Sequence, residues 1–171
     1  KRTTQENHKL YSTENDTAII ERLLIKNKPL IVLAPGASNQ QRTIPVNLLH
    51  TIISNIDTLK YDIVLIGKTN SNIINNKVSS PIIPRNLPNV INLVDQLTIH
   101  GTLKLIEHAS GLICSESSIL HYGTIIELPM LVVVPDKNIK HYGLIDINDR
   151  HQGYFKSFGF ANVVVVDFQD L

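Results

Sequence analysis

The segment ICSESSILHYGTIIELPMLVVV, from Ile113 to Val134, places a short helical pattern between two apolar runs. Both runs are short, rich in branched aliphatic residues and bounded by turn residues, which is typical of strands buried on both faces of a sheet. Three hydroxyls and a carboxylate lie where the first run ends, and a histidine follows one turn later. The segment therefore predicts a strand, a helix and a second strand, with polar side chains gathered at the first junction.

The same alternation extends along the rest of the chain. Strands are expected at 29–34, 62–67, 90–94, 111–115, 130–134 and 162–168. Helices are expected at 16–28 with Asp16 or Asn15 as the cap, from Pro45 to 56, at 102–109, at 117–128 and near 151–158, and the segment 68–89 is expected to be a loop with one helical turn. Strands that alternate with helices indicate a parallel sheet with right-handed crossovers. The predicted fold class is α/β, a doubly wound parallel sheet.

Length and composition favour one domain. The chain has 171 residues, of which 43% are hydrophobic, enough for one well-buried core. The polar residues 1–15 are interpreted as a linker or lead-in, and residues 16–171 as a single domain. Because the chain opens at Lys1 without Met, in a polar segment, we expect it to be a piece of a longer protein.

Several functional classes are disfavoured. Lys and Arg total 16 against 15 Asp and Glu, so no strong field would attract nucleic acid. No apolar run reaches the roughly 18 residues that a membrane span needs. The single cysteine, Cys114, excludes an internal disulfide framework and lies in an apolar strand, as a buried inert thiol would. Ser117 lacks the flanking glycines of a nucleophile elbow, and Gly67-Lys68-Thr69 lacks the first glycine of a P-loop.

The first candidate site is the loop APGASNQQRTIP, which leaves the predicted strand at 29–34. In an open parallel sheet, ligands bind beyond the carboxyl ends of the strands. Gly36 allows close backbone approach, Ser38 offers an amide and a hydroxyl, and Arg42 offers a fork of donors, which together suit a phosphate. The alternative is an ordinary turn with a solvated arginine.

The second candidate site is the turn from Ser115 into the next predicted helix. Glu116 can accept hydrogen bonds from ribose hydroxyls, and Ser117 and Ser118 lie at a helix N-terminus, which favours anions. His121 lies four residues after Ser117 and therefore on the same side of the helix. The alternatives are that these side chains only cap the helix and that His121 is an ordinary packed or surface residue.

Read together, the two loops resemble glycosyltransferase family 9, the lipopolysaccharide heptosyltransferase family. IVLAPGASNQQRTIP is similar to the start of the family's C-terminal domain, where a strand, P-G-A-S or P-G-A-G, and a basic residue precede Trp-Pro. Arg42 holds the basic position and Pro45 the proline. The segment from Asn89 to Val134 looks like the family's second motif, D-[ST]-G-x-x-H followed by a proline. There Glu116, Ser117, Ser118, His121 and Pro129 stand for Asp, Ser or Thr, Gly, His and Pro.

The resemblance implies one Rossmann-like half of a GT-B fold, the half that binds a nucleoside-diphosphate sugar such as an ADP-heptose. It implies that Ser38, Arg42 and the amides at Ser117 and Ser118 contact the diphosphate, that Glu116 faces the ribose or the sugar, and that His121 lines the pocket. The acceptor would be a glycan or a lipid-linked, lipopolysaccharide-type molecule.

The family's proposed catalytic base belongs to the N-terminal domain, and no metal or other cofactor is needed. The resemblance therefore implies no catalytic residue in this chain, an inactive fragment without the N-terminal domain, and a cytoplasmic location, with the inner face of a bacterial membrane as an option.

Three positions depart from the family pattern: Glu116 for Asp, Ser118 for Gly and Ile44 for Trp. Two other functions stay open, and the changes at Ser118 and Ile44 favour the first of them. One is a degenerate GT-B half that serves as a non-catalytic binding or scaffold module, and the other is a sugar-nucleotide epimerase or hydrolase. The similarity fades after Pro135, and residues 136–160 have no counterpart in it.

Overall fold

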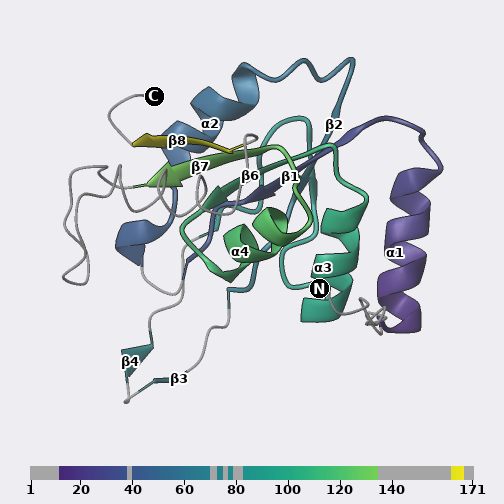
Figure 1. The fold of residues 1–171 in the computed structure, drawn as a ribbon, viewed down its shortest axis with the longest axis horizontal. Helices are drawn as coiled ribbons and strands as arrows, with labels where there is room; N and C mark the ends of the chain where they lie inside the picture. The colour runs from purple at the N-terminus through teal and green to yellow at the C-terminus, as the bar shows by residue number, and fades with distance from the viewer. Residues whose placement is uncertain are drawn as a thin grey trace, which may run out of the picture.

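The computed structural model describes residues 12–37, 40–69, 73–74, 77–78, 83–134 and 163–167. Its strands are β1 (Leu30–Ala34), β2 (Asp62–Leu65), β3 (Ile73–Ile74), β4 (Lys77–Val78), β5 (Val90–Asn92), β6 (Gly111–Ser115), β7 (Met130–Val134) and β8 (Val163–Asp167). Its helices are α1 (Glu14–Leu24), α2 (Val46–Ser54), α3 (Ile99–Glu107) and α4 (Ser118–Ile125), with a short 3-10 helix, η1, at Gln40–Arg42 (Figure 1).

Six of the strands form one sheet in the order β5-β2-β1-β6-β7-β8, and every neighbouring pair is parallel. The predicted doubly wound α/β fold is confirmed. Along the chain, the strands first extend this sheet from β1 toward β5 and then extend it from β6 toward β8, in the opposite direction. The strand order therefore reverses between β1 and β6, at the kind of crevice where open α/β sheets bind their ligands.

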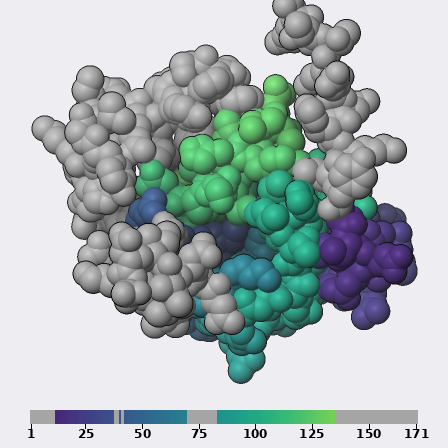
Figure 2. All heavy atoms as spheres, turned by 90° about the horizontal axis from the view of Figure 1, so that it is seen from below, coloured from purple at the N-terminus to yellow at the C-terminus, as the bar shows by residue number. Residues whose placement is uncertain are grey.

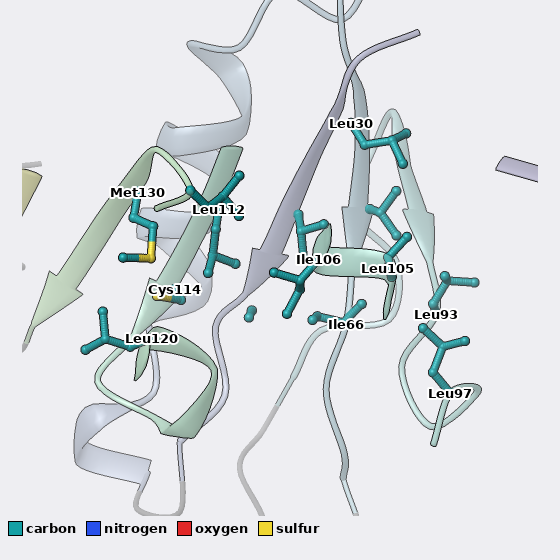
Figure 3. Close-up of a cluster of buried hydrophobic side chains, with 14 of the residues drawn as sticks. Leu30, Ile66, Leu93, Leu97, Leu105, Ile106, Leu112, Cys114, Leu120 and Met130 are labelled. Carbon is teal, nitrogen blue, oxygen red and sulfur yellow. The ribbon is translucent and has the colours of Figure 1, made fainter. Parts of the chain in front are cut away.

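The two faces of the sheet carry separate apolar cores. Along β1, Val32 packs on the face covered by α1, α3 and α4, whereas Leu33 packs on the face covered by α2. β6 alternates in the same way, with Cys114 on the first face and Ile113 on the second. Figure 3 shows side chains of the first core. Because both faces are covered, the strands read in the sequence as nearly continuous apolar runs.

Helix α1 starts earlier than the sequence pattern indicates. Its N-cap is Thr13, which accepts from the Asp16 amide while Asp16 accepts from the Thr13 amide, at 3.1 and 3.0 Å. The predicted cap at Asp16 or Asn15 is therefore wrong. Asp16 also accepts from the amide and the hydroxyl of Thr98, the N-cap of α3, at 3.0 and 2.6 Å. One buried carboxylate thus joins the starts of two helices.

Most other differences concern element ends. α3 begins at Ile99 rather than at 102, β5 ends at Asn92 rather than at 94, and α4 ends at Ile125 rather than at 128. Between β2 and β5 the described residues include the antiparallel pair β3 and β4, where one helical turn was expected. The helix expected near 151–158 falls outside the described residues, as does the rest of 136–160.

Cys114 is fully buried, as predicted, and burial raises the pKa of its thiol to about 12. In the part of the chain that the structure describes, none of the helices has both the length and the apolar character needed to cross a bilayer.

Candidate functional site

A cavity of about 740 Å³ opens at the carboxyl ends of the central strands β2, β1 and β6. Its lining residues are Ala34, Gly36, Ala37, Arg42, Ile66, Gly67, Lys68, Ile83, Leu93, Leu97, Ile99, Thr102, Glu116, Ser117, Ser118, Ile119 and His121. Figure 2 shows a hollow in the surface, with blue atoms at its floor, between green and teal parts of the chain. The cavity lies where the strand order reverses.

Six of the seven predicted site residues line this cavity: Gly36, Arg42, Glu116, Ser117, Ser118 and His121. Ser38 falls outside the described residues. The two loops singled out in the sequence therefore meet at one site, although they are far apart in the chain. They meet because β1 and β6 are neighbours in register, with Leu33 opposite Ile113 and Ala34 opposite Cys114.

The loop after β1 is folded back on itself. The amide of Ile44 donates to the carbonyl of Pro35 at 3.0 Å, and the amide of Ala37 donates to the hydroxyl of Thr43 at 3.3 Å. Ile44 is only 1% exposed and packs in the core beneath α2. The side chain of Ile44 therefore stabilises the loop from below and is not among the residues that line the cavity.

The turn after β6 begins with a buried hydroxyl. Ser115 is 0% exposed, and its Oγ donates to the carbonyl of Gly36 at 3.0 Å. This bond joins the two loops directly. The sequence placed Ser115 at the right junction, but only the pairing of β1 with β6 shows which carbonyl it meets.

Ser117 occupies the N-cap position of α4, yet its side chain makes no capping hydrogen bond. Its Oγ is buried and has no hydrogen-bond partner in the described structure. The alternative in which the Ser117 side chain only caps the helix is therefore wrong. The first-turn amides of α4 do not donate to the Ser117 hydroxyl, and the helix N-terminus, with its partial positive charge, adjoins the cavity.

Glu116 and His121 reach the cavity from either side of Ser117. Glu116 is half-buried and His121 is exposed, so both side chains can meet a ligand from solvent. The described residues contain no group of three or more His, Cys, Asp and Glu side chains arranged to hold a metal ion.

One wall of the cavity was missed by the sequence interpretation. It is formed by residues between the end of β2 and the first residue of α3, namely Ile66, Gly67, Lys68, Leu93, Leu97 and Ile99. Gly67 has φ 153°, and a Cβ there would collide with Cδ1 of Ile83, so glycine is required at this strand exit. A glycine directly after an apolar strand was the available signal.

Asp95 holds this wall together. It accepts from the amide and hydroxyl of Thr69 at 2.9 and 2.5 Å and from the guanidinium of Arg85 at 2.6 Å. The hydrogen bonds from Thr69 lower the pKa of Asp95, as do the charges of Arg85 and Lys68, whereas burial raises it. The carboxylate thus stays ionised and fixes the loop that carries Lys68.

The cavity lining therefore combines two kinds of group. Arg42, Lys68 and the N-terminus of α4 supply positive charge, while Ile66, Leu97 and the 57% exposed Ile99 supply apolar surface. Such a site suits a ligand with both an anionic group and a flat apolar group.

No family model and no curated protein matches this chain in sequence. Solved structures with a similar fold include an Escherichia coli ADP-heptose lipopolysaccharide heptosyltransferase II, with a TM-score of 0.58 and 14% identity over 90% of this chain and 43% of that one. A glycosyltransferase family 9 protein from Veillonella parvula has a TM-score of 0.58 and 12% identity over 94% and 42% of the two chains.

The glycosyltransferase of kitacinnamycin is also similar, with a TM-score of 0.51 and 10% identity over 99% of this chain and 35% of that one. This chain spans less than half the length of each of the three proteins. At these identities the likeness concerns the fold, which is the Rossmann-like α/β fold seen in these glycosyltransferases.

Proposed function

We propose that this chain is the donor-binding, C-terminal half of a GT-B glycosyltransferase related to family 9, and that its cavity binds a nucleoside-diphosphate sugar. The main support is the meeting of two loops at the reversal of strand order, where an arginine, a helix N-terminus and an unpartnered buried hydroxyl all adjoin one cavity. A diphosphate can accept hydrogen bonds from each of these groups.

The proposed roles follow the character of each part of the cavity. Arg42 and the first amides of α4, at Ser117 and Ser118, bind the diphosphate together with Ser38 and Gly36 of the first loop. The Ser117 hydroxyl donates to a phosphate oxygen. Glu116 accepts from hydroxyls of the ribose or the sugar, and His121 lines the same part of the pocket. The apolar wall around Leu97 and Ile99 suits a nucleobase.

In transfer, Arg42 and the N-terminus of α4 stabilise the negative charge that develops on the departing nucleoside diphosphate. The base that deprotonates the acceptor hydroxyl belongs to the N-terminal half, so this chain alone binds donor without turning it over. We propose a heptose or another hexose-type sugar as the transferred group and a glycan or lipopolysaccharide-type acceptor. Transfer would need no metal and would take place in the cytoplasm, with the inner face of a bacterial membrane as an option.

Calorimetry of the chain with ADP, UDP and GDP, and with their sugars, tests this function. We expect dissociation constants in the micromolar to millimolar range and a loss of about tenfold or more in the Arg42→Ala variant, since a charge-assisted hydrogen bond contributes roughly 1.5–3 kcal/mol. Arg22→Ala is the matched control, because Arg22 is exposed on α1 and does not line the cavity.

Three results would contradict the proposal in different ways. If no nucleotide binds at millimolar concentration, the non-catalytic scaffold module is the function that remains. Release of free sugar or an epimer without acceptor indicates the hydrolase or epimerase. Equal binding by Arg42→Ala and Arg22→Ala places the ligand elsewhere.

A further inference from the structure

The peptide group that joins Gly36 to Ala37 is held at both of its polar ends by side chains. Its carbonyl accepts from Ser115 Oγ at 3.0 Å, and its N–H donates to Thr43 Oγ1 at 3.3 Å. Both side chains belong to buried residues, with 0% exposure at Ser115 and 2% at Thr43. Water therefore does not readily replace either hydroxyl.

These two hydroxyls connect three separate pieces of the cavity wall. Gly36 and Ala37 line the cavity themselves, Thr43 directly follows Arg42, and Ser115 directly precedes Glu116. The bond from Ser115 spans 79 positions of the chain. The peptide group is thus a common anchor for the first loop, the arginine and the turn into α4.

The bond from Ser115 also affects the electrostatics of the site. A carbonyl oxygen carries partial negative charge, and an unpaired one at the wall of an anion site would oppose the ligand. Donation from Ser115 offsets that charge. Fixing the loop before the ligand arrives also lowers the entropy lost on binding.

We infer that Ser115 and Thr43 are positioning residues that hold the Gly36–Ala37 peptide group and thereby preset the anion-binding part of the cavity. Neither residue lines the cavity. They act through the loop that they fix.

The experiment compares Ser115→Ala, Thr43→Val and Thr43→Ser with the wild type. Thr124→Val is the matched control, because the Thr124 hydroxyl is buried and bonded, to the Leu120 carbonyl at 2.8 Å, but lies away from the cavity. Two quantities are measured: the hydrogen-exchange rate of the Ala37 amide in the ligand-free protein, and the dissociation constants for ADP, UDP and GDP. Ligand affinity as a readout rests on the proposed function, whereas amide exchange does not.

We expect Ser115→Ala and Thr43→Val to speed exchange at Ala37 about tenfold and to weaken nucleotide binding by about tenfold, the effect of losing one buried hydrogen bond. Thr43→Ser, which keeps the hydroxyl, and Thr124→Val should stay near the wild type in both quantities. Circular dichroism and thermal melting identify any variant that does not fold.

Unchanged exchange at Ala37 in both folded variants overturns the inference, whether or not a nucleotide binds. Faster exchange with unchanged affinity, in a wild type that binds, overturns the positioning role. Faster exchange in a wild type that binds no nucleotide supports the anchored loop and removes the proposed function.

Discussion

The Ser117 hydroxyl is a buried polar atom without a hydrogen-bond partner in the described structure. Such an atom has lost its contacts with water and gained nothing in return, so its removal should not destabilise the ligand-free protein. We expect Ser117→Ala to leave the free energy of unfolding unchanged or to raise it by about 1 kcal/mol, while nucleotide binding weakens about tenfold. Urea denaturation and calorimetry measure the two effects.

Ser110→Ala is the control, since Ser110 is exposed before β6 and lies outside the cavity. It should change neither quantity by more than about 0.5 kcal/mol. A marked loss of stability in Ser117→Ala would mean that the hydroxyl has a structural partner, and its assignment to a ligand would fail.

Gly67 combines a left-handed backbone with a steric contact, and the two effects can be separated. In Gly67→Ala the new Cβ meets Cδ1 of Ile83 and the backbone keeps φ 153°. We expect a loss of about 3 kcal/mol in unfolding free energy, from backbone strain of about 1–3 kcal/mol together with overpacking. Ile83→Val removes Cδ1, so the double variant should recover the overpacking part.

Urea denaturation of the two single variants and the double variant gives the coupling free energy. Strict additivity of the two losses would contradict the predicted collision and leave only the backbone strain.

The most specific contact between two helices is the one that Asp16 of α1 makes with the start of α3. Asp16 is 0% exposed, and Gly101 of α3 passes so close that a Cβ there would overlap the Asp16 carboxylate. Burial raises the pKa of Asp16, but the hydrogen bonds from Thr98 and Thr13 outweigh burial and lower the pKa to about 2. The carboxylate therefore stabilises the folded state when it is ionised.

The pH dependence of the folding stability follows from the lowered pKa of Asp16. Since the folded pKa lies below the unfolded value of 3.8, the stabilisation is complete above about pH 5 and is lost as the pH falls through 4 toward 2. It amounts to about 2 kcal/mol at neutral pH. We expect Asp16→Asn to lose about that much unfolding free energy and to show a flatter acid limb between pH 4 and 2.

Glu21→Gln, on the exposed side of α1, should leave both the stability and the acid limb near those of the wild type. Urea denaturation at a series of pH values measures all three proteins. An acid limb in Asp16→Asn as steep as in the wild type would assign the pH dependence to other groups.

Strands and helix caps differ in how far the sequence alone predicts them. The strands at 111–115 and 130–134 could be predicted to the residue because they are buried on both faces and end at polar turns. The cap of α1 could not be, because Thr13, Asn15 and Asp16 all suit a cap in isolation. What selects Thr13 is the burial of Asp16 against Thr98, 82 positions away.

Only part of the cavity could be predicted from the sequence, because the rest depends on the order of the strands in the sheet. The two polar loops could be found because hydroxyls, a carboxylate and an arginine are unusual directly after apolar runs. The wall at Gly67 and Leu97 could not be found in the sequence, because its place depends on β2 lying beside β1 and on β5 lying beside β2. The bond from Ser115 to Gly36 depends likewise on the pairing of β1 with β6.

Across the domain, that strand order brings two cationic side chains to the carboxyl end of the sheet, Arg42 after β1 and Lys68 after β2. Arg42 is half-buried, whereas Lys68 is exposed and therefore more strongly screened by salt. We expect Lys68→Ala to weaken diphosphate binding by only about twofold to fivefold, as for an exposed charge worth roughly 0–1 kcal/mol.

The contributions of Arg42 and Lys68 to binding affinity should differ in their dependence on ionic strength, because the Debye length falls from about 10 Å at 0.1 M salt to about 3 Å at 1 M. High salt should remove most of the difference between Lys68→Ala and the wild type while preserving much of the loss in Arg42→Ala. Calorimetry with ADP at both salt concentrations measures this, and Arg22→Ala again controls for net charge. If Lys68→Ala lost as much affinity at 1 M as at 0.1 M, the lysine would make a direct, desolvated contact with the ligand, and the anionic group would lie closer to β2 than to α4.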